Sequence, residues 1–336
     1  MVDDNSQSMV DDNSQWFHGA DTHRLIRADG GSGWSVARAA PSGSTPAETA
    51  FHPTDTPALF EAIRPRLRDE LEAASEVLVC LDFDGTLAPI VDRPENATIT
   101  ADNERAIERL DAADSITTAV VSGRALSDVV ARVDGPSIYA GNHGLELRRN
   151  GSETVHPIAR HRMDLVAEAC GLLEEVVEPI PSCRVEHKRL TGTVHVRGTP
   201  DPVRSLVARH VDDVVERIGD GALDVSSGKE IIEIAPAIPW GKGHAVELIE
   251  ESHTDDAFVL YVGDDRTDES GFRAAETGIR RRPVASTRDD WAGTSKGIGI
   301  YVGDDTDDGG GSHASARLSS PGEVASVLEW LASVIE

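Results

Sequence analysis

The sequence is poor in lysine, cysteine, aromatic residues and long apolar runs, and each shortage excludes a class of protein. Aromatic residues make up 4% of 336 residues, and no apolar run approaches the roughly 18 residues that a membrane-spanning helix needs. Three cysteines, Cys80, Cys170 and Cys183, are odd in number and lack C-x-x-C spacing. This pattern favours reduced thiols in a cytoplasmic protein over a disulfide framework or a cysteine metal site.

Basic residues are also scarce, and most of them are arginine. The net charge is −27, and only four of the 32 basic residues are lysines, namely Lys188, Lys229, Lys242 and Lys296. Acidic residues are spread along the whole chain, which is typical of proteins from salt-accumulating halophiles and predicts a source in a halophilic archaeon. The alternative is an acidic surface for a basic partner. Nucleic acid and anionic membranes are excluded as partners by the same charge.

The N-terminal part of the chain has no pattern of a folded domain. The segment MVDDNSQ occurs at residues 1–7 and again at 9–15, and a stretch rich in Gly, Ser, Thr, Pro and Ala follows. We therefore expect residues 1–57 to be a disordered or loosely ordered extension without an assigned function.

Apolar runs and helical patterns alternate in the rest of the chain. Short apolar runs suited to buried strands occur at 77–81, 116–121, 138–140, 257–262 and 299–303. Helical periodicity occurs at 59–71, 100–110, 127–133, 242–251 and 321–335. This alternation predicts an α/β fold with a doubly wound, Rossmann-like parallel sheet.

The pattern changes between residues 144 and 235. A helix followed by an antiparallel strand pair occurs twice, with helices at 163–177 and 203–218 and strand pairs at 184–196 and 223–234. Such a repeat is typical of a small α+β unit. We expect residues 144–235 to be an inserted cap domain, and 58–143 with 236–336 to form the core domain.

Carboxylates gather at the predicted ends of strands, where open parallel sheets bind their ligands. Asp82 and Asp84 follow the first apolar run and, two apart in an extended segment, face one side. With Asp264 they would form a site for Mg²⁺, supported by Asp265 and Asp268. Asp82 would attack phosphorus, and Asp84 would protonate the leaving oxygen and then deprotonate water.

Other strand ends supply groups for a phosphate. Ser122 offers a hydroxyl and an amide, and Thr86 offers a hydroxyl beside the flexible Gly85. Lys242, a rare lysine at a predicted helix start, would clamp the anion. Gly123 and Arg124 would bind substrate too, unless they merely terminate the strand and pair locally.

These motifs resemble the haloacid dehalogenase superfamily, with DFDGT at 82–86, Ser122 in VVSGR, Lys242, and GDDRTDE from Gly263. Within it, the chain is similar to the trehalose-6-phosphate phosphatase family. The shared landmarks, in order, are LDFDGTLAPI, VVSGR, GNHGLE, VEHK, GKEIIEI, WGKGHAVE and VGDDRTDE. The resemblance covers about residue 70 to the C-terminus.

The resemblance implies roles for each of these residues. Asp82 would be the nucleophile, Asp84 the general acid and base, and Asp264 the third Mg²⁺ ligand. Glu186, Lys188 and Glu233 would bind sugar hydroxyls, with Asn142 and His143 at the junction of cap and core. An ordinary cross-strand ion pair is the alternative for the three cap residues. The sequence departs from the family at Ala235, where an arginine is usual.

The resemblance also implies the reaction, which is Mg²⁺-dependent hydrolysis of trehalose 6-phosphate to trehalose and phosphate. Alternatives with the same chemistry are sucrose 6-phosphate and glucosyl- or mannosyl-phosphoglycerate as substrates, or a phosphomutase reaction. A different class of alternative is a non-catalytic regulatory partner of a sugar synthase. A functional link to a trehalose-phosphate synthase is expected in either case.

Overall fold

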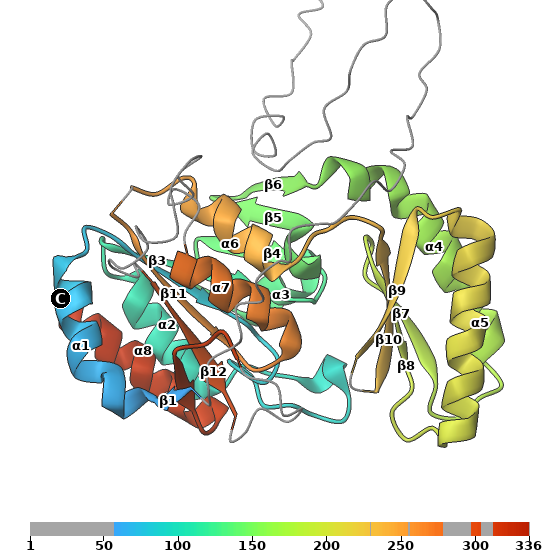
Figure 1. The fold of residues 1–336 in the computed structure, drawn as a ribbon, viewed down its shortest axis with the longest axis horizontal. Helices are drawn as coiled ribbons and strands as arrows, with labels where there is room; N and C mark the ends of the chain where they lie inside the picture. Colours follow the sequence, from blue (N-terminus) through green and yellow to red (C-terminus); the bar gives the residue numbers. More distant parts are fainter. Residues whose placement is uncertain (1–56, 229, 255, 278–296, 304–311, 336) are drawn as a thin grey trace, which may run out of the picture.

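The computed structural model describes residues 57–228, 230–254, 256–277, 297–303 and 312–335. Within these ranges two β-sheets, each with its own helices, lie side by side (Figure 1). The expected N-terminal extension falls outside the described residues except for Pro57.

The larger sheet has the strand order β1-β13-β12-β11-β2-β3-β4-β5-β6, and its first seven strands are parallel neighbours. These seven strands, in chain order, are β1 (Ala58–Leu59), β2 (Val77–Leu81), β3 (Ile116–Val121), β4 (Ile138–Gly141), β11 (Phe258–Gly263), β12 (Gly297–Val302) and β13 (Ala316–Leu318). The strands at 77–81 and 116–121 have the predicted bounds.

Helices cover both faces of this sheet, as the sequence predicts for a doubly wound fold. One face packs against α1 (Phe60–Ala73), α2 (Ala101–Asp111), α3 (Leu126–Arg132) and α8 (Pro321–Ile335). The other face packs against α6 (Lys242–Glu250) and α7 (Glu269–Thr277). The helix α7 was not predicted as an element.

Strand β2 shows why its residues form the centre of the sheet. All five side chains are buried; Val77, Val79 and Leu81 pack on the α1 side, and Leu78 and Cys80 pack on the α6 side. A strand buried on both faces needs such an unbroken apolar run. Its carboxyl end therefore lies in the middle of the sheet, between β3 and β11.

One expectation about the domain boundary differs from the structure. Residues assigned to the cap form β5 (Glu146–Arg149) and β6 (Ser152–Val155), which extend the core sheet by antiparallel pairing with β4. The turn at Asn150 and Gly151 has positive φ at both residues, which is the geometry of a tight hairpin. The insertion therefore begins after Val155, and the sheet is mixed at this edge.

The second sheet, with its two helices, is the cap. Its strand order is β7-β8-β10-β9, from β7 (Arg184–His187), β8 (Gly192–His195), β10 (Ile231–Pro236) and β9 (Leu223–Gly228). All neighbouring pairs are antiparallel. The helices α4 (Pro157–Val177) and α5 (Asp201–Gly219) pack on one face, so the other face is turned toward the core (Figure 1).

The two connections between core and cap meet at a stack of aromatic rings. His156 lies in the first connection and Trp240 in the second, with ring centroids 4.7 Å apart. Trp240 also stacks on His244 of α6 at 4.8 Å. Both connections are thus held against the same core helix, close to Lys242. Separately, among the residues that the structure describes, no helix has the length and apolarity needed to cross a membrane.

Candidate active site

The ends of four neighbouring parallel strands carry the polar residues singled out in the sequence. Asp82 follows β2, Ser122 follows β3, Asn142 follows β4 and Asp264 follows β11. Backbone bonds fix these ends to one another: the Asp82 N–H donates to Val262 O at 2.9 Å, and the Ser122 N–H donates to Ala140 O at 2.9 Å. The expected grouping at one edge of the sheet is present.

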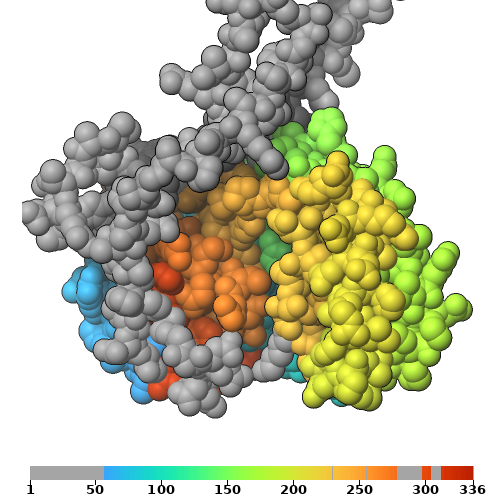
Figure 2. All heavy atoms as spheres, turned by 45° about the vertical axis from the view of Figure 1, so that its right-hand side comes forward, coloured from blue at the N-terminus to red at the C-terminus, as the bar shows by residue number. Residues whose placement is uncertain are grey.

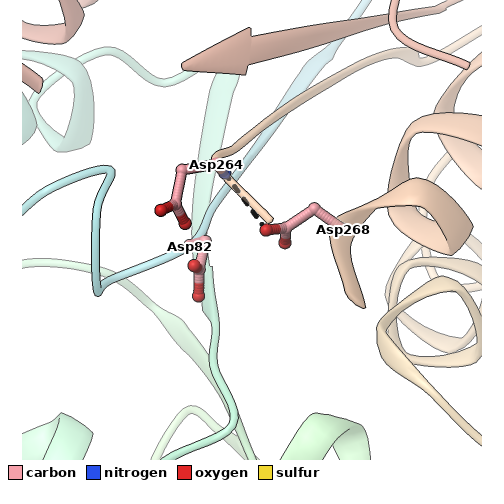
Figure 3. Close-up of side chains that lie close together, drawn as sticks. All are labelled: Asp82, Asp264 and Asp268. Atoms are coloured by element: carbon pink, nitrogen blue, oxygen red, sulfur yellow. Dashed lines mark hydrogen bonds between the residues drawn. The ribbon is translucent and has the colours of Figure 1, made fainter. Parts of the chain in front are cut away.

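Three carboxylates converge at this edge (Figure 3). Among the described residues, Asp82, Asp264 and Asp268 place carboxylate oxygens within 4.8 Å of one another. Asp82 and Asp268 are 3% and 0% exposed, so neither is screened by bulk water. The expected trio contained Asp84 instead of Asp268; the Asp84 carboxylate lies outside this group.

Lys242 begins α6 and carries the positive charge of the cluster. Its Nζ lies 3.0 Å from Asp82 Oδ1 and 2.7 Å from Asp268 Oδ1, and its side chain is 2% exposed. Burial alone would lower the pKa of Lys242, but Asp268 and Asp82 raise it well above its usual range. The lysine is therefore a fixed cation beside the proposed nucleophile.

Asp268 holds Lys242 and has little capacity left for a metal. Its Oδ1 accepts from Lys242 at 2.7 Å and from the Tyr261 hydroxyl at 2.6 Å. Its Oδ2 accepts from the backbone N–H groups of Asp264 and Asp265, each at 3.1 Å. Since a carboxylate has about four lone-pair sites, these four bonds saturate it. Tyr261 was not predicted, because an aromatic residue inside an apolar strand is typical of a core position.

Asp265 is also committed to local structure. Its Oδ1 accepts from the Thr267 N–H at 2.8 Å and from the Thr267 hydroxyl at 2.6 Å, and it caps the short helix at Arg266–Asp268. Asp265 and Asp268 therefore support the site by shaping the loop after β11, as the capping box of this turn shows.

Asp82 and Asp264 remain as the carboxylates that could bind a metal. Burial, with repulsion from neighbouring acids, raises the pKa of both above the usual range, and Lys242 opposes this shift. A cation between them would favour the charged forms. Gly85, at φ +77°, makes room for Asp264, since a Cβ at this position would lie 1.8 Å from the Asp264 Oδ2 atom. Carboxylate oxygens of this kind suit Mg²⁺, so the donor set fits the ion.

Asp84 points elsewhere, toward Arg124. The guanidinium donates to both carboxylate oxygens, from Nε at 2.7 Å and from Nη2 at 2.8 Å. Arg124 also donates to Asp128 at 2.7 Å and to Pro94 O at 2.7 Å. The side chain of Asp84 is 36% exposed and that of Arg124 is 8% exposed. The expected role of Asp84 as a metal ligand through its carboxylate therefore does not fit this arrangement.

The remaining phosphate-binding candidates follow strands β2 and β3. Thr86 is fully buried, and its hydroxyl has no hydrogen-bond partner among the described residues. Ser122 is 1% exposed, and its hydroxyl accepts from the Arg124 N–H at 3.2 Å. The ring of His143 packs against Gly123, where a Cβ would lie 2.6 Å from it.

Three cap residues reach toward this edge of the core. Lys188 Nζ donates to the Gly123 carbonyl at 3.3 Å, and Glu233 Oε1 lies 3.1 Å from His143 Nε2. Glu186 pairs with His195 of the neighbouring strand at 2.8 Å. In the register of the cap sheet, Glu186 and Glu233 flank Thr193 on either side. The three predicted cap residues thus share the face that is turned toward the core.

Asn142 joins the core to the cap through hydrogen bonds of its side chain. Its amide donates to Glu146 and to the Lys188 carbonyl, the latter at 2.9 Å, and its oxygen accepts from the Thr191 hydroxyl at 2.6 Å. Arg189 of the cap pairs with Glu146 at 2.8 Å. Asn142 is fully buried, and its side-chain amide and oxygen are hydrogen-bonded to core and cap residues; its expected contact with the substrate stays a prediction. Arg189 and Thr191 lie in no motif recognised in the sequence, and Glu146 ends the GNHGLE landmark but was given no role.

A furrow on the surface separates the core from the cap. Figure 2 shows it between the orange surface of the core and the yellow surface of the cap. The carboxyl ends of the core strands lie on one side, and the polar face of the cap sheet lies on the other. Such a position, between two units, is where small-molecule sites are common.

Comparison with known proteins places the chain among phosphatases. A family model described as trehalose-phosphatase matches residues 80–296. A trehalose-phosphate phosphatase of Mycobacterium avium is 36% identical over 264 residues, which are 77% of this chain and 62% of that protein. Trehalose-phosphate phosphatase B of Arabidopsis thaliana is 31% identical over 270 residues, which are 76% of this chain and 66% of that protein. The matched region spans less than two thirds of either relative.

Solved structures show the same fold. The C-terminal domain of Candida albicans trehalose-6-phosphate phosphatase aligns over 83% of this chain and 98% of that domain, with a TM-score of 0.66 and 23% identity. A structure of Aspergillus fumigatus trehalose-6-phosphate phosphatase aligns over 83% and 99%, with a TM-score of 0.56 and 26% identity.

Proposed function

Because the chain belongs to the trehalose-phosphatase family, we propose that it is a phosphatase that hydrolyses trehalose 6-phosphate to trehalose and phosphate. The observation that carries this proposal is the buried pair of Asp82 and Lys242, 3.0 Å apart, beside Asp264 where the core strands end. A nucleophile, a fixed cation and a second carboxylate are the groups that phosphoryl transfer through a carboxylate requires.

We assign Mg²⁺ to the oxygens of Asp82 and Asp264. When bound, the ion would neutralise charge on the phosphoryl oxygens and reduce their repulsion with the nucleophile. Asp265 and Asp268 would not bind the ion through their saturated or capping oxygens; they hold the loop that presents Asp264. Mg²⁺ is the proposed ion because the available donors are carboxylate oxygens.

The reaction then follows from the positions of two carboxylates. Asp82 Oδ attacks phosphorus and forms an aspartyl phosphate, while the bond from phosphorus to the sugar oxygen breaks. Asp84 gives a proton to that leaving oxygen and then takes one from the water that cleaves the aspartyl phosphate. Lys242 keeps a positive charge beside Asp82 throughout. The Ser122 hydroxyl, the Thr86 hydroxyl and the Gly123 amide would hold phosphoryl oxygens.

The cap would recognise the sugar. Glu186, Lys188 and Glu233 present a cation and two anions to the furrow, and such groups select a polyhydroxyl ligand because a wrong sugar leaves them unpaired. His143 would join them, since it already contacts Glu233. Ala235 lies on the same strand as Glu233 and, two residues away, on the same face, so the missing arginine alters the sugar side of the site and not the phosphate side.

We further propose the domain division that this reaction needs. The cap would comprise the insertion between β6 and α6, and the remaining described residues would form the core. Closing the cap would exclude water while Asp82 is phosphorylated, and opening it would release the products. The aromatic stack of His156, Trp240 and His244 is the proposed pivot, because both connections meet there.

The setting of the enzyme follows from the same sequence features. We propose a halophilic source from the net charge of −27 with few lysines, and a cytoplasmic location from the three free cysteines. A functional link to a trehalose-phosphate synthase is proposed because such a synthase would make the substrate. The retained Asp82, Asp84 and Asp264 support an enzyme over a non-catalytic regulatory partner.

A substrate panel tests the function. Phosphate release would be measured in molar KCl with Mg²⁺ from trehalose 6-phosphate, sucrose 6-phosphate, glucosyl- and mannosyl-phosphoglycerate, and glucose 6-phosphate. We expect the highest kcat/KM for trehalose 6-phosphate. The Asp82→Asn variant should lose about a thousandfold or more of kcat and still bind substrate.

The controls separate chemistry from substrate choice. A preference for another sugar phosphate would contradict the trehalose assignment alone, whereas unchanged turnover in Asp82→Asn would refute the nucleophile. Removing divalent cations with a chelator should abolish turnover, and Mg²⁺ should restore it.

A further inference from the structure

We infer that Arg124 is a positioning residue that acts only through Asp84, and that during formation of the aspartyl phosphate its contribution is confined to the transfer of a proton to the leaving sugar oxygen. This inference rests on the proposed function, because it requires Asp84 to be the general acid. It also replaces the earlier expectation that Arg124 binds the substrate.

The bonds of Arg124 leave little for a substrate. A guanidinium has five N–H donors. Four of them are used, by the two oxygens of Asp84, by Asp128 and by the Pro94 carbonyl. With 8% of its side chain exposed and its guanidinium 5.1 Å from the centre of the Phe83 ring, Arg124 has no room to swing toward a phosphate.

The backbone of Arg124 is fixed as firmly as its side chain. Its N–H donates to the Ser122 hydroxyl at 3.2 Å, and its carbonyl accepts from the Asn142 N–H at 2.7 Å. Asp128, the second anion on the guanidinium, is itself held by Arg132 at 2.9 Å. Arg124 is thus part of a rigid chain of alternating charges that begins at Asp84 and ends at Arg132.

Asp84 is the end of this chain that lies two residues from the nucleophile in the sequence. Its side chain is 36% exposed, whereas that of Arg124 is 8% exposed. Each of its oxygens accepts one bond from Arg124 and retains another lone pair. A bidentate guanidinium therefore fixes the plane of the carboxyl group and still leaves a position free to carry a proton.

In the first half of the reaction, this arrangement matters in one chemical event. As the bond from Asp82 to phosphorus forms, the sugar oxygen leaves with the electron pair of its bond to phosphorus and takes the proton from Asp84. A sugar alkoxide is a poor leaving group and needs that proton, whereas p-nitrophenolate leaves without it. Disturbing the orientation of Asp84 must therefore slow the reaction of a sugar phosphate and leave that of p-nitrophenyl phosphate nearly unchanged.

The test compares kcat/KM for trehalose 6-phosphate and p-nitrophenyl phosphate in the full chain with Mg²⁺ and molar KCl. kcat/KM includes steps only up to departure of the first product, so later hydrolysis of the aspartyl phosphate does not enter. For Arg124→Met we expect a loss of about a hundredfold with trehalose 6-phosphate and less than about threefold with p-nitrophenyl phosphate. Asp84→Asn should show the same selectivity.

Two further variants guard against a misleading result. Arg124→Met/Asp84→Asn should have the same kcat/KM for trehalose 6-phosphate as Asp84→Asn alone, because Arg124 acts through Asp84. Arg124→Lys keeps the positive charge but loses the two parallel N–H groups that bind both Asp84 oxygens. It should lose less kcat/KM for trehalose 6-phosphate than Arg124→Met, and kcat/KM for p-nitrophenyl phosphate should again change little. It serves if Arg124→Met does not fold. The burst of p-nitrophenolate released in the first turnover, before the aspartyl phosphate is hydrolysed, reports folding in each variant.

The opposite pattern would overturn the inference. Equal losses for both substrates, with weaker inhibition by inorganic phosphate, would make Arg124 a phosphate ligand. If the losses of kcat/KM in the two single variants multiplied in the double variant, Arg124 would act independently of Asp84. Failure of the proposed function is distinguishable, since Asp82→Asn would then keep turnover of both substrates.

Discussion

At the scale of single residues, the site is a set of buried charges that hold one another in place. Lys242 lies between Asp82 and Asp268, and Asp268 is saturated by Lys242, Tyr261 and two backbone amides. Burying charges is costly unless each has partners, so loss of any one member leaves another uncompensated. Asp268 and Tyr261 therefore help to position the proposed nucleophile through Lys242.

Tyr261→Phe tests this support. The variant removes the hydroxyl that donates to Asp268 at 2.6 Å, so the unfolding free energy should fall by about 1.5–3 kcal/mol, as for a bond to a charged group. We also expect kcat to fall severalfold, because Lys242 loses its fixed partner geometry. Urea denaturation and steady-state kinetics in the same buffer measure both.

Tyr139→Phe is the matched control for that variant. The Tyr139 hydroxyl is also buried, but it donates to the Val133 carbonyl at 2.9 Å, away from the carboxylates. Its loss should lower stability by about 1 kcal/mol without changing kcat. If both variants kept the wild-type kcat, Tyr261 would be a purely structural residue.

The sequence predicts some of these residues much better than others. Asp82, Ser122 and Asp264 were found because polar groups at the carboxyl ends of apolar strands stand out, and Lys242 was found because a rare lysine at a predicted helix start stands out. Tyr261 and the pairing of Arg124 with Asp84 could not be found, because each depends on which side chains meet across separate strands. Local sequence patterns predict where strands and helices end. Which side chains pair with one another depends on how these elements pack.

At the scale of elements, the cap sheet contributes its polar face and the core contributes its strand ends. The contact between Glu233 on β10 and His143 after β4 joins the two, at 3.1 Å. Burial alone would raise the pKa of Glu233, but the charge of His143 and its hydrogen bond lower it to about 2. The carboxylate is thus held in its charged form by the folded protein.

The pH dependence of stability should reveal this contact. Because the folded pKa of Glu233 lies below its ordinary value, ionisation stabilises the protein above about pH 4.5, and the effect is lost as the pH falls toward 2. The difference in unfolding free energy between wild type and Glu233→Gln should therefore shrink over that range. Denaturation at several pH values, at constant molar salt, gives the difference; a constant value would contradict the contact.

Element prediction succeeded where the pattern was long and failed where it was short. Strands β2 and β3 were located to the residue because their apolar runs are unbroken. The hairpin of β5 and β6 was missed, since its four-residue strands contain Arg148, Arg149 and Glu153 and read as surface loop. Its membership of the core sheet depends on pairing with β4, which no local pattern reports.

At the scale of the whole molecule, charge dominates the behaviour expected in solution. A net charge of −27 on 336 residues makes the compact state repel itself at low salt. The screening length falls from about 8 Å at physiological ionic strength to about 3 Å at 1 M, so most of this repulsion disappears in concentrated salt.

We therefore expect stability to rise with salt. The melting temperature should increase steadily in KCl from about 0.15 M to about 3 M, with most of the rise below about 1 M where the screening length changes most. Sorbitol at matched osmolality is the control for solvent exclusion and should give a smaller rise. A melting temperature that is flat or falls in KCl would argue for an acidic surface that binds a basic partner.

The insertion of the cap also decides the order in which the site can be assembled during translation. Strands β2 and β11 are neighbours in the sheet, yet the whole cap lies between them in the sequence. A growing chain therefore presents β2 with one apolar edge unpaired until the cap has been synthesised, and this edge invites mispairing. Asp82 and Asp264 meet only when β11 docks, so the proposed metal site cannot form in a nascent chain before the proposed sugar-binding cap has been synthesised.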